Sequence, residues 1–118
     1  METRTYDIGD TVFDEGEAGH VAYLVKSGEV KITKMSKDDS QRTIATVRAG
    51  QLIGEMALID DEPRAASAIA LMKTEMLVVS KEDFDKRLET SDQVVRLLLQ
   101  SLTTRLRQQA QTIIDLTL

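Results

Sequence analysis

Residues 54–67 read GEMALIDDEPRAAS, and this stretch, called the cassette below, decides how the rest of the chain is interpreted. A glycine precedes a carboxylate, an apolar turn leads to an acidic tip, and the only proline of the chain precedes Arg64. Gly54 has no Cβ, so the backbone there can approach a ligand closely. Arg64 is a permanent cation whose forked donors match two oxygens of a phosphate. We therefore expect the cassette to enclose a small anion.

Several backbone amides of the cassette are candidates to assist. A helix that begins near Glu55 would present unpaired N–H groups, and the small residues after Arg64 would let their amides reach the same anion. The Glu55 carboxylate would then accept hydrogen bonds from ligand hydroxyls. The alternative is a plain salt bridge between Glu55 and Arg64 across the turn. The cassette residues that we expect at the ligand are Gly54, Glu55, Met56, Ala57, Arg64, Ala65 and Ala66.

The composition narrows the class of protein. The chain has 118 residues, 42% of them hydrophobic and 30% charged, which suits one globular domain over residues 1–118. There is no cysteine, and His20 is the only histidine, so metal ligands for an enzyme are lacking and we expect no enzymatic activity. The net charge of -5 argues against nucleic-acid binding. No membrane span or signal peptide is visible, so we expect a cytoplasmic protein.

Short strands separated by turns fill the chain up to about Ser80. All six glycines lie in the turns between apolar or β-branched runs, which predicts an all-β sandwich or barrel over residues 4–80. The candidate strands are Thr11–Phe13, Val21–Val25, Val30–Thr33, Thr43–Val47, Ala66–Leu71 and Met76–Val79.

Two helices are predicted after this β region. Ser80 is a good N-cap with Asp83 three residues on, which predicts a short helix over residues 81–89. Ser91 and Asp92 then cap a long helix that we extend over residues 92–115. Its apolar residues have coiled-coil spacing, which favours a homodimer contact over packing on the β region. The predicted seam contains Val95, Leu99, Leu102, Leu106, Gln109, Ile113 and Leu116.

The cassette resembles the phosphate-binding cassette of the cyclic nucleotide-binding domain family, with each fixed element of that pattern present. The resemblance extends over almost the whole chain, because FDEGEAG at residues 13–19, SGEV at 27–30 and AGQ at 49–51 are similar to the family's turns. It implies an eight-stranded antiparallel, jelly-roll-like β-roll followed by a hinge helix and a lid helix. The helices that usually precede the roll in this family, and the DNA-binding domain that follows the long helix in some relatives, have no counterpart in these residues, so we do not expect DNA binding by them.

The resemblance also implies residue roles. Glu55 would bind the ribose 2′-hydroxyl and Arg64 the cyclic phosphate, assisted by the amides of Ala57 and Ala65. Ala65 lacks the hydroxyl that favours cyclic GMP in relatives, so cyclic AMP is expected. Gln109 would read the base from the lid helix, or else only fix the helix register. The apolar residues at pocket positions, whose alternative is ordinary core, are Ile32, Ile44, Val47 and Ile53.

The implied function is a cyclic AMP sensor that couples ligand binding to movement of its C-terminal helices. The alternative is a dimerisation or interaction module whose pocket is vestigial or differently occupied. An intact pair of Glu55 and Arg64 favours the sensor, because a vestigial pocket has no need of both side chains. The sequence does not indicate which output domain or pathway such a sensor would control.

Overall fold

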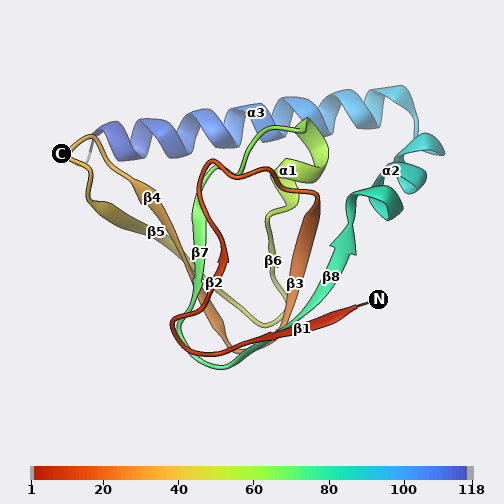
Figure 1. Cartoon of the computed structure of the whole chain (residues 1–118). Helices are drawn as coiled ribbons and strands as arrows, with labels where there is room; N and C mark the ends of the chain where they lie inside the picture. The colour runs from red at the N-terminus through yellow and green to blue at the C-terminus, as the bar shows by residue number, and fades with distance from the viewer. Residues whose placement is uncertain (1, 117–118) are drawn as a thin grey trace.

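A computed structural model describes residues 2–116, except for the side chains of Ala57, Ile113, Ile114 and Leu116. Eight strands form a β-roll, and two C-terminal helices follow it (Figure 1). The strands are β1 (Thr3–Tyr6), β2 (Thr11–Phe13), β3 (Val21–Ser27), β4 (Glu29–Met35), β5 (Gln41–Arg48), β6 (Leu52–Ile53), β7 (Ser67–Ala70) and β8 (Thr74–Ser80). The helices are α1 (Glu55–Asp60), α2 (Lys81–Glu89) and α3 (Gln93–Leu116).

The strands form two antiparallel sheets of four strands each. One sheet has the order β1-β8-β3-β6 and the other the order β2-β7-β4-β5. Strands that are distant in the chain pair in both sheets, with Tyr23 opposite Val78 and Ile32 opposite Ala68. The fold is the one implied by the family resemblance, so the prediction of an eight-stranded antiparallel β-roll followed by helices is confirmed.

The core lies between the sheets and receives side chains from six strands. Because large aromatic residues are few, aliphatic residues fill most of this space, and Phe13 stacks on Tyr23 with ring centroids 6.2 Å apart. Alternate residues of β8 face inward, as expected for a strand with one buried face. The buried core cluster consists of Phe13, Tyr23, Val25, Val30, Ile53, Ala68, Met76 and Val78.

The six predicted strands are all present, and β1 and β6 were missed. β1 is a polar run that pairs only with β8, from Thr3 opposite Leu77 to Tyr6 opposite Thr74. A further departure lies in β5, where the pairing with β4 slips by one residue at Ile44. Such a bulge places consecutive side chains differently from a regular strand.

The two C-terminal helices begin at the predicted caps. The Asp83 amide donates to the Ser80 hydroxyl at 3.1 Å at the start of α2. At the start of α3, the Val94 amide donates to the Asp92 carboxylate at 2.8 Å. α3 lies along one end of the roll, above α1, and runs toward the β4–β5 hairpin (Figure 1). In the part of the chain that the structure describes, no helix is both long and apolar enough to cross a membrane.

Candidate functional site

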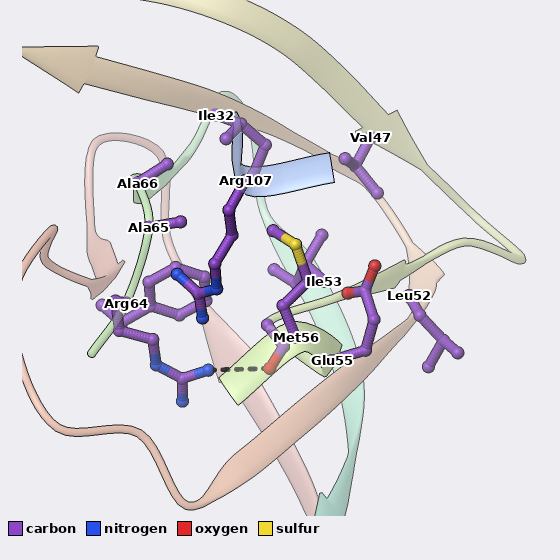
Figure 2. Close-up of a pocket in the computed structure, with 12 residues that line it drawn as sticks. Ile32, Val47, Leu52, Ile53, Glu55, Met56, Arg64, Ala65, Ala66 and Arg107 are labelled. Carbon is purple, nitrogen blue, oxygen red and sulfur yellow. Dashed lines mark hydrogen bonds between the residues drawn. The ribbon is translucent and has the colours of Figure 1, made fainter. Parts of the chain in front are cut away.

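A pocket opens where α1, the end of the cassette and α3 meet the roll. It encloses ≈ 180 Å³, and Figure 2 shows Arg64 and Arg107 on one side of it and Glu55 beside Ile53 and Leu52 on the other. Most of the predicted ligand residues line it, although they come from separate strands, a helix and a loop. The lining residues are Phe13, Ile32, Val47, Leu52, Ile53, Gly54, Glu55, Met56, Arg64, Ala65, Ala66 and Arg107.

Arg64 is the buried cation of this pocket. Its side chain is 5% exposed, and its guanidinium lies over the Phe13 ring at 4.3 Å from the centroid. Nη1 donates to the Gly54 carbonyl at 3.0 Å and Nη2 to the Val21 carbonyl at 2.8 Å, while Nε has no partner among the described residues. Burial lowers the pKa of Arg64, because removing a charged group from water disfavours the charged form.

Two glycines make room for this guanidinium. A Cβ on Gly19 would overlap the guanidinium and Cδ of Arg64, and a Cβ on Gly54 would overlap Nη1. Gly54 also has φ +75°, a left-handed conformation that side chains rarely adopt. The absence of both side chains therefore leaves space for the Arg64 guanidinium over the Phe13 ring.

The predicted alternative of a salt bridge between Glu55 and Arg64 is not what the structure has. Within residues 2–116, Arg64 forms no ion pair with a carboxylate, and its two terminal nitrogens donate to backbone carbonyls. Glu55 begins α1, is partly exposed and lines the pocket without pairing with Arg64 (Figure 2). Its carboxylate is therefore available to a group inside the pocket.

The apolar wall is formed by three of the four predicted residues. Ile32, Val47 and Ile53 line the pocket, and sequence reasoning missed Phe13 and Leu52 beside them. Ile44 does not line it and is 38% exposed, because it lies in the bulge of β5. Ala57 is the third residue of α1, and its side chain lies outside the described residues.

Arg107 of α3 is a pocket residue that the sequence did not point to. It forms a two-pronged ion pair with Asp60, with Nε to Oδ2 at 2.6 Å and Nη2 to Oδ1 at 3.1 Å. Its third nitrogen, Nη1, donates to the Pro63 carbonyl at 3.1 Å. Leu99, Thr103 and Arg107 share one helix face at intervals of four residues, and Thr103 of that face is buried.

The acidic tip of the cassette holds both C-terminal helices. Asp60 binds Arg107 of α3, and the next residue, Asp61, pairs with Lys81 of α2. Lys81 Nζ also donates to the Leu58 carbonyl at 3.3 Å, and the hydrogen bond that Lys81 donates to the Asp61 carboxylate raises the pKa of Lys81. The tip is thus an attachment point for the helices and not only a solvated turn.

The outward face of α3 carries most of the predicted seam. Leu102 and Leu106 are about half exposed, whereas Leu99, which belongs to the same predicted seam, is partly buried. Gln109 is exposed on the outward face and lies outside the pocket lining. Ile113 and Leu116, the last two residues of the predicted seam, have side chains outside the described residues. The apolar residues exposed on this helix are Val94, Val95, Leu97, Leu98, Leu102 and Leu106.

The class of protein follows from this fold and pocket together with the sequence of residues 3–91. Those residues match the family described as the cyclic nucleotide-binding domain, which is well over half of the chain. The chain therefore belongs to the cyclic nucleotide-binding domain family, as the cassette predicted.

Individual relatives share the same region. The chain is 36% identical over 108 residues to the cyclic AMP receptor protein of Thermus thermophilus, covering 92% of this chain and 50% of that protein. It is 35% identical over 88 residues to the cAMP-dependent protein kinase regulatory subunit of Yarrowia lipolytica, covering 75% of this chain and 23% of the relative. Among solved structures, it resembles the cAMP-bound form of the EAL enzyme Bd1971 with TM-score 0.87 and 35% identity, covering 92% of this chain and 29% of that one. The chain thus spans half or less of the length of these relatives.

Proposed function

We propose that this domain binds a cyclic nucleotide, preferentially cyclic AMP, with its phosphate at Arg64. The observation that carries the proposal is a cation that is 5% exposed and has no carboxylate partner among the described residues. Burying an uncompensated charge is costly, so such a site favours an anionic ligand. The position of Arg64 at the end of a family-defining cassette supports a phosphate as that anion.

The other pocket residues suit the rest of a nucleotide. Glu55 is proposed to accept hydrogen bonds from the ribose 2′-hydroxyl, because its carboxylate faces the pocket without an ion pair to Arg64. The amides of Ala57 and Ala65 are proposed to assist at the phosphate. Sugar and base would then lie against an apolar wall, whose burial contributes affinity. That wall consists of Ile32, Val47, Leu52 and Ile53.

Cyclic AMP is proposed over cyclic GMP because of Ala65. A methyl group at this position, directly after Arg64, offers no hydroxyl to the guanine amino group. The solved forms of the EAL enzyme Bd1971 include one bound to cAMP and one bound to cGMP, so the family likeness alone does not choose the base. Titration of both nucleotides by isothermal calorimetry tests this preference, and tighter binding of cyclic GMP would overturn it.

The role of Arg64 is tested by titrating cyclic AMP into Arg64→Ala. Losing charge-assisted hydrogen bonds of about 1.5–3 kcal/mol should weaken binding roughly tenfold to a hundredfold. The matched control is Arg48→Ala, because Arg48 is an exposed arginine that pairs with Glu29 at the surface. Equal affinity of Arg64→Ala and wild type would rule out the proposed phosphate site. Absence of any binding to wild type would instead favour the alternative of a vestigial pocket.

We also propose that ligand binding is coupled to the two C-terminal helices through the cassette tip. Arg107 and Lys81 attach α3 and α2 to adjacent carboxylates of the segment that would close on the ligand. A small displacement of α1 would then bias the packing of both helices, which is how local binding becomes a larger rearrangement. The proposed role is regulatory and not catalytic.

The outward face of α3 supports a homodimer as the proposed assembly. Leu98, Leu102 and Leu106 expose an apolar stripe at helical spacing, and a second copy of the same helix would cover it. Gln109 continues this stripe, a place where a polar residue fixes register. Light scattering after size-exclusion chromatography should find a dimer for wild type and a monomer for Leu102→Asp. A monomeric wild type at high concentration would refute the dimer.

A further inference from the structure

We propose that Lys34 is a positioning residue that aims the N–H of Ala66 at the bound anion. Lys34 lies on β4 and is absent from the pocket lining, so it would act through the backbone of the cassette and not by touching the ligand. The inference rests on the proposed function, because it takes the anion to lie beside Arg64.

The side chain of Lys34 is more buried than is usual for a lysine, and its ammonium has specific partners. It is only 12% exposed, and its ammonium donates to the Ala65 carbonyl at 2.7 Å. The Glu15 carboxylate lies 3.4 Å from the same ammonium. Lysine is rarely this buried without a specific partner, and here the shortest contact is to a backbone carbonyl of the cassette. The contact therefore constrains the peptide that joins Ala65 to Ala66.

The geometry of the peptide bond determines how the contact with Lys34 orients the N–H of Ala66. No peptide bond among the described residues is cis, so the carbonyl of Ala65 and the N–H of Ala66 point in opposite directions. Ala65 and Ala66 both line the pocket and Lys34 does not. Lys34, which does not line the pocket, holds this carbonyl, so the N–H of Ala66 points away from the Lys34 ammonium, and we take that direction to be the pocket side.

The remaining backbone groups of this segment support the same assignment. The Arg64 amide donates to the Glu17 carbonyl at 2.9 Å, and the Arg64 carbonyl accepts from the Gly16 amide at 2.8 Å. The amides of Ala65 and Ala66 precede β7 and donate to no other described group. Unpaired N–H groups in a half-buried segment are costly unless a ligand or water accepts from them. They are the donors left for an anion beside Arg64.

Lys34 would also strengthen the donor that it orients. A cation on the carbonyl oxygen polarises the amide, and hydrogen bonds in a chain reinforce one another in a low-dielectric site. Glu15 keeps the lysine in place, because its carboxylate accepts from the Met35 amide at 2.9 Å. The Glu15 amide in turn donates to the Ser67 hydroxyl at 2.8 Å, which ties the loop before β3 to β7.

The test compares cyclic AMP binding by wild type, Lys34→Met and Lys34→Arg. We expect Lys34→Met to bind roughly tenfold more weakly and Lys34→Arg to recover most of the loss, because arginine restores a cationic donor. Lys26→Met is the matched control, since Lys26 pairs with Glu75 at the surface, and its affinity should not change. Thermal melts of each variant report whether the fold is retained.

A second readout separates positioning from mere stabilisation. In amide proton NMR spectra, ligand binding should shift the Ala66 signal downfield in wild type and much less in Lys34→Met. If wild type does not bind cyclic AMP, the proposed function fails and this inference falls with it. If wild type binds but the Ala66 shift and the affinity are the same in Lys34→Met, only the role of Lys34 is overturned. If Lys34→Met does not fold, the same two measurements on Lys34→Arg decide, and loss of the Ala66 shift despite a retained cationic donor refutes the role.

Discussion

The ion pair between Asp60 and Arg107 should be a measurable attachment of α3 to the cassette. Two hydrogen bonds join the charged groups, at 2.6 Å and 3.1 Å, and the side chains are only 12% and 19% exposed. We would replace Asp60 by asparagine and Arg107 by methionine, singly and together. Methionine keeps an unbranched apolar chain, so the packing of the arginine stem is partly retained.

The expected magnitude follows from the burial and the two-pronged geometry. Exposed ion pairs contribute about 0–1 kcal/mol, whereas hydrogen bonds to charged groups contribute about 1.5–3 kcal/mol each before desolvation is subtracted. We therefore expect a coupling free energy of about 2 kcal/mol in the double-mutant cycle. Each single substitution should cost about 2–3 kcal/mol of unfolding free energy, because it leaves one charge or its partner unsatisfied.

Urea unfolding without nucleotide, followed by circular dichroism, measures the four free energies of the cycle. The pair between Glu82 and Lys86 on α2 is the matched control, because its side chains are 79% and 69% exposed. Its coupling should be about 0.5 kcal/mol or less. Hydrogen exchange of the α3 amides should accelerate in Arg107→Met. A coupling for Asp60 and Arg107 no larger than that of the control would refute the attachment.

Four further substitutions test the pocket and the helix contacts. Gly19→Ala should lower the unfolding free energy by about 1–3 kcal/mol, because the new methyl group overlaps the Arg64 guanidinium. It should also weaken cyclic AMP binding, as Arg64→Ala does. An unchanged affinity in calorimetry and an unchanged urea unfolding curve would contradict this prediction. Val47→Thr should weaken calorimetric binding roughly fivefold, whereas Ile44→Thr should leave it unchanged, and the reverse order would place Ile44 in the pocket. The pKa of Lys81 in the folded protein is raised above 10.5. The unfolding free energy that wild type has in excess of Lys81→Met should therefore be constant below that pH and decrease as the pH rises above it. A difference between the two proteins that does not change with pH would contradict this prediction.

The strands predicted from sequence were those with strong local patterns. Val21, Tyr23 and Val25 alternate along β3, and such alternation is visible without knowing the partner strand. β1 has no apolar alternation and exists because β8 offers it an edge, and the two residues of β6 are too few for any pattern. Tertiary pairing decides these elements, so the sequence alone did not indicate them.

The sequence indicated the candidate site residues within the cassette, but it did not indicate which residues of other elements lie beside them. Arg64 and Glu55 were singled out because the cassette resembles a family pattern, and both line the pocket. Arg107 was missed because apolar residues occur on several faces of α3, so the rotation of the helix against the roll was not determined by its own residues. Ile44 was expected at the pocket from the resemblance and is not among the lining residues, because the bulge in β5 that displaces it cannot be seen from the alternation of one strand.

Because α2 and α3 are attached to the consecutive residues Asp61 and Asp60, the length of the cassette tip is constrained. Loops at the surface usually tolerate insertions and deletions, but a residue added or removed between Leu58 and Asp61 would rotate the two carboxylates away from the helices that they hold. Glu62, one position later, has no ion pair among the described residues, and its backbone amide, which donates to the Asp60 carboxylate at 3.1 Å, is present in every residue except proline. We therefore expect homologous sequences to carry different residues at the position of Glu62, whereas the length of the preceding turn should be constant.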